Sequence, residues 1–280
     1  MEWVASLGAR GLQPKTIKAY LSSLRSLHVD IDLPFTACEA PVVQRLIRGI
    51  KCYHGERARN PKLPITLNIL RKLCETLSES LSAIDHTMKA AMALAFAGFL
   101  RCGEFTLGNN ATFDPAVNLT RSSVKFVPDI DRADRIILTL PSSKTDPFRK
   151  GVSVVIAAAP GTITCPVAAL REIFKGIQPR GDNSPLFEGF AMGVALTRDL
   201  FIARLKALLI AHGFDSSKYS GHSFRRGAAS SAAVAGYADF EIQLLGRWRS
   251  DAYKLYIDVP QERVLHLSNR LHWAEAEPHA

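Results

Sequence analysis

The chain has 280 residues, of which 47% are hydrophobic and 22% charged, so it is long enough for one large or two smaller domains and has the composition of a globular rather than a disordered protein. The formal net charge of +9 favours a polyanionic partner, most simply nucleic acid, although charge alone leaves a merely soluble basic protein equally open. The five cysteines form no CxxC pair or Cys/His cluster, which argues against a zinc site and a disulfide framework.

Reduced cysteines and the absence of a signal-peptide pattern predict an intracellular protein. The longest apolar run, residues 90–100, is too short to cross a bilayer, so we expect a buried helix there and no membrane partner.

The first part of the chain predicts a small helical unit. Apolar side chains recur at helical spacing over residues 16–28 and 41–53. Both segments also carry basic side chains, for which a solvated helix face is the ordinary explanation: Lys15, Lys18, Arg25, Arg45, Arg48 and Lys51. The stretch 54–64 is polar, basic and bounded by proline, which is typical of a linker, and it predicts domains at 1–60 and 61–280.

The remainder predicts a mainly α unit with one small antiparallel β-sheet, an α+β class. Helical periodicity covers residues 66–81 and 86–100. Three short β-branched runs follow, separated by turn-rich segments, at 123–127, 135–140 and 152–157. The helical pattern then returns at 166–174, 198–212, 223–234 and 240–244.

Several basic residues occupy positions that suit anion binding, but each has an ordinary structural explanation. Arg101 directly follows the apolar run, where a cation favours a helix C-terminus, and Glu104 is its natural ion-pair partner. His222 and Arg225 lie three apart at the start of a predicted helix, where free N–H groups bind anions, although a structural histidine is equally open. Lys144 lies between two predicted strands, where a solvated hairpin tip is the simplest interpretation.

Two tyrosines, Tyr253 and Tyr256, follow the sequence Gly246-Arg-Trp-Arg, and tyrosines at helical spacing more often belong to a core than to a catalytic site. Other catalytic motifs are lacking. The sequence contains neither GxxxxGK[ST] nor HExxH, and Arg225 replaces the second glycine that a serine-hydrolase elbow needs after Gly221.

Taken in order, these residues resemble the tyrosine recombinase (phage integrase) superfamily. In that family an arginine follows an apolar helix, as Arg101 does in GFLRCGE, and a lysine lies on a β-hairpin, as Lys144 does. An HxxR box opens a later helix, and a glycine precedes the nucleophilic tyrosine by ten residues. The box is matched by His222 and Arg225, and the spacing from Gly246 selects Tyr256 over Tyr253. The phrase GRWRSDAYKLYI looks most like recombinases of eukaryotic mobile elements such as Cryptons.

One position departs from the family pattern. The residue after the glycine, usually histidine or tryptophan, contacts the scissile phosphate in the family, but here it is Arg247, followed by Trp248. Both are therefore kept as candidates for that contact.

The resemblance implies a tyrosine recombinase catalytic fold preceded by a helical core-binding domain that clamps DNA. It implies cleavage and rejoining of double-stranded DNA through a 3′-phosphotyrosine at Tyr256, without metal, ATP or another cofactor. Arg101 and Arg225 would stabilise the phosphate, His222 would act as base, Lys144 as acid, and Glu104 would orient Arg101 or His222. The expected DNA contacts are basic: Lys15, Lys18, Arg25, Arg48, Lys51, Arg57, Arg59 and Lys62.

The resemblance further implies assembly into tetramers on DNA through an exchanged C-terminal helix, for which residues 262–273 are the candidate; packing on their own domain is equally open. In a eukaryotic host the protein would act in the nucleus. Two alternatives stay open: a domesticated DNA-binding protein without strand transfer, and a relaxing enzyme like a type IB topoisomerase.

Overall fold

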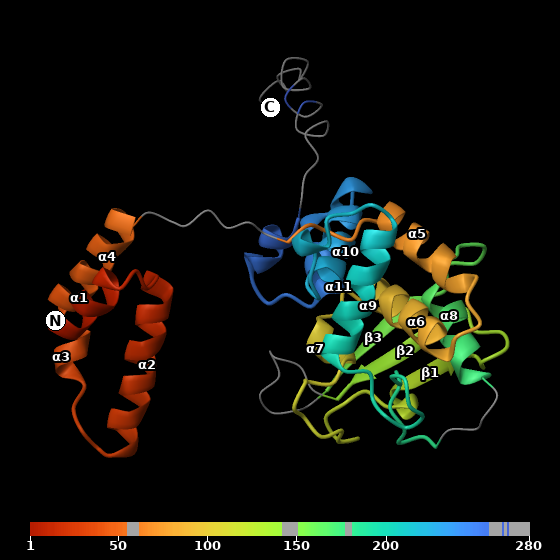
Figure 1. Ribbon diagram of the computed structural model, residues 1–280, viewed down its shortest axis with the longest axis horizontal. Helices are drawn as coiled ribbons and strands as arrows, with labels where there is room; N and C mark the ends of the chain where they lie inside the picture. Colours follow the sequence, from red (N-terminus) through yellow and green to blue (C-terminus); the bar gives the residue numbers. More distant parts are fainter. Residues whose placement is uncertain (55–61, 142–150, 177–180, 258–264, 266–267, 269–280) are drawn as a thin grey trace, which may run out of the picture. The chain divides into compact units, whose positions relative to one another are not determined.

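The computed structural model describes residues 1–54, 62–141, 151–176, 181–257, 265 and 268, and the chain divides into two compact units, Met1–Pro61 and Lys62–Ala280 (Figure 1). No helix among these residues is long and apolar enough to span a membrane.

The first unit is a small cluster of helices around its own core. Its helices are α1 (Glu2–Ala9), α2 (Pro14–Asp30), α3 (Thr36–Glu39) and α4 (Pro41–His54). The core collects one apolar face each of α1, α2 and α4, with the side chains of Val4, Leu7, Ile17, Leu21, Val43, Ile47 and Ile50. Because α1 and α4 pack closely, a Cβ on Gly8 would lie 2.7 Å from the Ile50 side chain. The predicted helices at 16–28 and 41–53 are confirmed as α2 and α4; α1 and α3 were not predicted.

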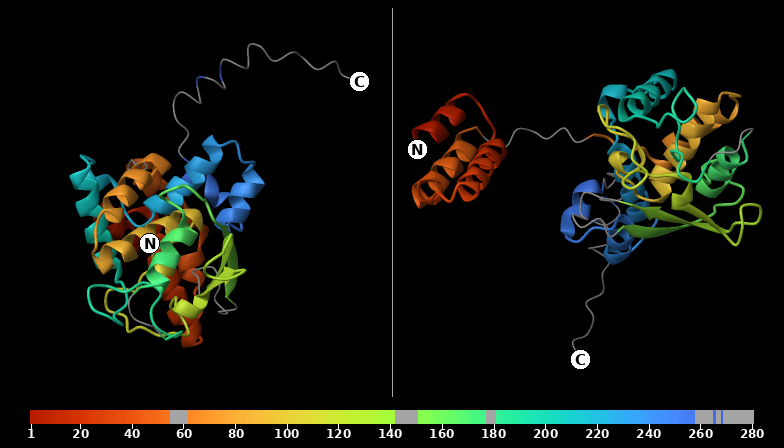
Figure 2. Two further views of the ribbon diagram at one scale, coloured as in Figure 1. Left: turned by 90° about the vertical axis from the view of Figure 1, so that its right-hand side faces the viewer. Right: turned by 90° about the horizontal axis from the view of Figure 1, so that it is seen from below.

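In its described residues, the second unit packs seven α-helices against a small sheet (Figures 1 and 2). They are α5 (Leu67–Ser78), α6 (Ala83–Ala97), α7 (Cys102–Phe105), α8 (Pro166–Phe174), α9 (Arg198–Ala211), α10 (Ser223–Val234) and α11 (Asp239–Gly246). Helix α6 is buried along most of its length, as its unbroken apolar sequence predicts, and it contacts α5, α8 and α10. It is therefore the central helix of this unit.

The sheet has three antiparallel strands in the order β1-β2-β3, namely Val124–Val127, Arg135–Leu140 and Val152–Ala157. Alternate residues of β2 are buried, as expected of a sheet with one face on the core. The predicted strands and the mainly α fold class with a small antiparallel sheet are thus confirmed.

Helix α10 lies against the segment that enters the second unit. A Cβ on Gly227 would lie 1.8 Å from the Ile65 carbonyl oxygen, so only glycine permits this approach. The Ile65 N–H also donates to the Ser223 carbonyl at 2.9 Å. These contacts fix the start of α10, which carries the predicted HxxR box, next to the core.

Candidate active site

Arg101 does not cap the apolar helix. That interpretation is wrong because α6 ends at Ala97 and the chain turns at Phe99, whose φ of 49° lies in the left-handed region. Arg101 instead takes the N-cap position of α7. The Glu104 carboxylate accepts from the Arg101 backbone N–H at 2.8 Å and from its Nη1 at 2.8 Å. One carboxylate of the same short helix thus holds both the backbone and the guanidinium of Arg101.

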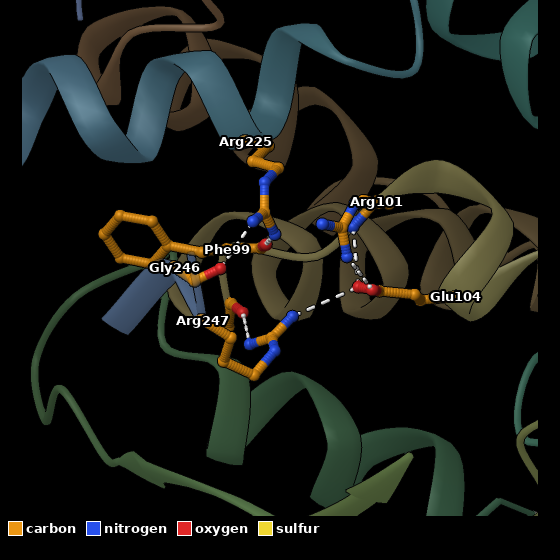
Figure 3. A network of polar contacts seen from close by, with 7 residues as sticks. Phe99, Arg101, Glu104, Arg225, Gly246 and Arg247 are labelled. Carbon is orange, nitrogen blue, oxygen red and sulfur yellow. Dashed lines mark hydrogen bonds and ion pairs between the residues drawn. The ribbon is translucent and has the colours of Figure 1, made fainter. Parts of the chain in front are cut away.

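Arg225, on the first turns of α10, is fully buried. Its Nη1 donates to the Phe99 carbonyl and its Nη2 to the Gly246 carbonyl, as Figure 3 shows. Its buried Nε has no hydrogen-bond partner in the described part of the chain. Arg225 therefore joins the turn after α6 to the end of α11, and its Nε–H is the donor that these contacts leave unused.

Arg247 ends α11 in an unusual backbone state, with φ 55° and ψ 41°. Its N–H donates to the Leu244 carbonyl and that of Trp248 to the Gln243 carbonyl, the two bonds of a Schellman motif that usually needs glycine here. Two contacts of the side chain offset the cost of this left-handed conformation. Nη2 pairs with Glu104 at 3.1 Å, and Nη1 donates to the Gly98 carbonyl at 2.8 Å (Figure 3).

Trp248 and Tyr256 lie beside the Arg225 guanidinium. The carbon of that guanidinium lies 4.0 Å from the centroid of the Trp248 ring and 5.8 Å from that of the Tyr256 ring. The two rings are 5.4 Å apart. Tyr256 belongs to a short 3-10 helix, Asp251–Tyr256, rather than to an α-helix. Tyr253 is buried in an apolar cluster with Phe99, Ile242 and Trp248, and its ring lies 6.2 Å from that of Trp248.

Helix α10 also holds the segment that carries Tyr256. The Ser230 hydroxyl donates to the Tyr256 carbonyl at 3.2 Å, and Arg226 Nη1 donates to the Leu255 carbonyl at 3.0 Å. Sequence reasoning missed Arg226 and Ser230, although Arg226 directly follows the HxxR box and Ser230 lies one turn further along the same helix.

The site concentrates positive charge around one carboxylate. Burial, and next the charge of Arg101, lowers the pKa of the Arg225 guanidinium to about 9, while Glu104 and Tyr256 act in the opposite direction. Burial also lowers the pKa of Arg247, which Glu104 opposes. Glu104 thus offsets the positive charge of all three guanidiniums. A bound phosphate would neutralise more of that charge.

The remaining predicted residues are placed differently. His222 is exposed at the N-cap of α10, one turn from Arg225. Lys144, Arg57 and Arg59 lie outside the described residues. The other expected DNA contacts are exposed on their respective units: Lys15, Lys18, Arg25, Arg48, Lys51 and Lys62. Arg25 pairs with Glu39 at 3.4 Å, and Lys62 Nζ donates to the Ser217 carbonyl at 2.7 Å.

Among the described residues, no three His, Cys, Asp or Glu side chains gather in a way that could hold a metal ion. What the arrangement can do is bind an anion with forked guanidiniums next to a phenol. Forked, delocalised donors match a phosphate better than lysine does.

Known proteins are similar to this chain in sequence and in fold. No protein-family model matches the chain. The chain is similar to an integrase/recombinase XerD homologue of Selenomonas ruminantium, with 28% identity over 183 residues that cover 64% of this chain and 47% of the relative. The chain thus matches about half the length of that curated relative.

Among solved structures, XerA recombinase aligns over 96% of this chain and 84% of its own, with a TM-score of 0.54 and 17% identity. The integrase of the Tn1549 transposon, in complex with transposon right-end DNA, aligns over 97% and 84%, with a TM-score of 0.59 and 16% identity. The fold is therefore that of the tyrosine recombinases. Together with the XerD homologue, these likenesses support that superfamily for this chain.

Proposed function

We propose that this protein cuts and rejoins double-stranded DNA as a tyrosine recombinase, with Tyr256 as the nucleophile. The phenol oxygen attacks a backbone phosphate, forms a 3′-phosphotyrosine and releases a 5′-hydroxyl. Attack by that hydroxyl, or by one from another strand, reverses the step. The bond energy is retained in the protein–DNA bond, so the reaction needs no ATP.

The observation that carries this proposal is the convergence of three guanidiniums, of which that of Arg225 lies 5.8 Å from the centroid of the Tyr256 ring. Arg101, Arg225 and Arg247 come from α7, α10 and the end of α11, and Glu104 contacts two of them. In the transition state, charge builds on the non-bridging phosphate oxygens, where each preorganised donor contributes about 3 kcal/mol. Arg247 is our candidate for the third phosphate contact because its guanidinium belongs to this cluster, whereas the Trp248 indole packs against the Arg225 guanidinium.

Proton transfer is assigned to His222 and Lys144. Tyrosine has an ordinary pKa near 10, so a base or a positive field must favour the phenolate. His222 lies on the helix that carries Arg225, and its side chain is exposed, which suits a base. Lys144, in the β2–β3 connection, is the candidate acid that protonates the leaving 5′-oxygen.

We assign the first unit to DNA clamping. On α2, Lys15, Lys18 and Arg25 are exposed and follow helical spacing, on the face that borders the buried Ile17 and Leu21. Such a face suits phosphate contacts, which release counterions and make binding steeply dependent on salt. The XerH recombinase and the Tn1549 integrase, both similar in fold, were solved as complexes with DNA.

The oligomeric state and the cellular location are also proposals. We expect tetramers on DNA, joined through the C-terminal segment 262–273 of one copy and a neighbouring catalytic unit. Helix α11 exposes Phe240 and Leu244 as a candidate surface for that segment. The phrase GRWRSDAYKLYI favours a eukaryotic mobile element, and hence an intracellular, nuclear site of action.

The full burial of Arg225 favours a second candidate function, a DNA-binding protein without strand transfer. Both terminal nitrogens of Arg225 already donate to backbone carbonyls, and the residue is 0% exposed.

A suicide duplex, nicked so that the cleaved strand is lost, separates these candidates. The DNA is taken from the ends of the element that encodes the protein. A recombinase forms a protein–DNA band that survives SDS, retains it in Tyr253→Phe and loses it in Tyr256→Phe. Salt-sensitive binding without any such band would leave the non-catalytic binder. Relaxation of supercoiled plasmid that lacks a recombination site would instead indicate a topoisomerase-like activity.

A further inference from the structure

The Trp248 indole adjoins the two groups that the proposed chemistry uses, the Arg225 guanidinium and the Tyr256 ring. Its side chain is buried, and its ring lies 4.0 Å from the carbon of the Arg225 guanidinium and 5.4 Å from the Tyr256 ring. The ring of Phe99 meets it edge-on, at 6.2 Å and 88°. The indole is therefore held on several sides and is not free to reach a ligand.

Gly246 leaves the space that the Trp248 ring occupies. A Cβ on Gly246 would lie 1.4 Å from Cζ3 of Trp248, so no other residue leaves the indole in place. The Gly246 carbonyl also accepts from Arg225 Nη2. The glycine that precedes the tyrosine by ten residues thus serves the tryptophan and the arginine together.

Arg225 needs such support because its surroundings disfavour its charge. Burial lowers its pKa, and the charges of Arg101 and Arg247 act in the same direction. An indole face attracts a cation through its quadrupole, more strongly than other aromatic rings and most strongly away from water. The same contact fixes the plane of the guanidinium fork, which decides where its donors point.

We propose that Trp248 is a positioning residue, whose indole holds the Arg225 guanidinium charged and in plane and docks the Tyr256 ring beside it. This deepens the proposed function and rests on it for the effect on cleavage. Trp248 does not touch DNA in this role. Its effect passes through Arg225, while Gly246 provides the room for the ring.

The first test uses the protein without DNA, so that it stands apart from any activity. Guanidinium-labelled arginine gives an Nε–H signal for buried Arg225, assigned by its loss in Arg225→Lys. We expect Trp248→Leu and Gly246→Ala to shift this signal and speed its exchange with solvent, and Trp248→Phe to preserve it. Phe187→Leu, a buried aromatic elsewhere in the core, and Gly103→Ala, where an added Cβ meets nothing within 4 Å, are the matched controls.

The second test measures cleavage of the suicide duplex in single turnovers. Trp248→Leu should slow adduct formation about ten- to a hundredfold, the usual effect of misplacing a reacting group, with DNA affinity unchanged. Trp248→Phe should restore most of the rate. An Arg225 signal that Trp248→Leu leaves unchanged, or that Phe187→Leu changes equally, overturns the proposal.

The two tests separate its failure from that of the proposed function. A wild-type protein that forms no adduct contradicts strand transfer, yet the Arg225 signal still decides the role of Trp248. If Trp248→Leu fails to fold, Trp248→Met removes the π face with a flexible apolar side chain, and the same comparison applies.

Discussion

Glu104 holds two of the three guanidiniums, so replacing it with glutamine tests whether the charge cluster is built as described. Its side chain is 4% exposed, against 19% for Arg101 and 17% for Arg247. Removing one partner of a buried ion pair costs about 3–5 kcal/mol because the other charge stays buried. Glutamine still accepts one hydrogen bond, which places the expected loss near the lower end, about 3 kcal/mol.

For a unit of this size, about 3 kcal/mol corresponds to a melting temperature lower by roughly 6–12 °C. Differential scanning calorimetry of the whole chain measures it as a shift in the transition of the second unit. The matched control is Glu172→Gln, because Glu172 pairs with Lys89 and His86 but is 37% exposed. Such a pair is worth at most about 1 kcal/mol. Equal shifts for the two variants, or no shift for Glu104→Gln, would refute the reasoning.

Three further predictions concern separate parts of the molecule. Gly227→Ala should destabilise the second unit by about 3 kcal/mol or more in urea unfolding, because its Cβ would clash with backbone that cannot yield cheaply. Ser230→Ala should slow adduct formation about tenfold without changing DNA affinity, since it frees the carbonyl of Tyr256; an unchanged single-turnover rate would contradict that role. Replacing Lys15 and Lys18 with glutamine should lower the slope of log affinity against log salt by about 2 in magnitude, and an unchanged slope would remove both from the DNA-binding surface.

Much of the fold follows from local patterns. The β-branched runs gave β2 and β3 at their observed bounds, Arg135–Leu140 and Val152–Ala157, because β-branched residues favour strands and turn-rich segments bound both runs. Helices α8 and α10 were predicted equally well, and Pro166 marks the start of α8.

The parts that failed depend on tertiary contacts. The apolar run was expected to continue as a helix to Leu100, but α6 ends at Ala97 because Phe99 takes a left-handed conformation that nothing in its own chemistry favours. Arg225 donates to the Phe99 carbonyl, a contact across 126 positions of sequence.

The candidate site was likewise predicted in part from the sequence, and the rest depends on tertiary contacts. The order and spacing of the residues identified Arg101, Arg225 and Tyr256 as candidates, and the structure brings the two arginines and the tyrosine into one region. The roles of Arg247 and Trp248 could not be separated in the sequence, since both follow Gly246. Only packing shows that one guanidinium joins the charge cluster while the indole lies beneath Arg225.

The central claim is that DNA becomes attached to Tyr256, and mass spectrometry of the trapped adduct tests it most directly. Trypsin cleaves after Arg249, Lys254 and Arg263, so Tyr253 falls in the peptide 250–254 and Tyr256 in the peptide 255–263. After nuclease digestion, we expect the residual nucleotide on the peptide 255–263, linked through a phosphotyrosine. A nucleotide on the peptide 250–254, or on neither, would contradict the assignment of the nucleophile.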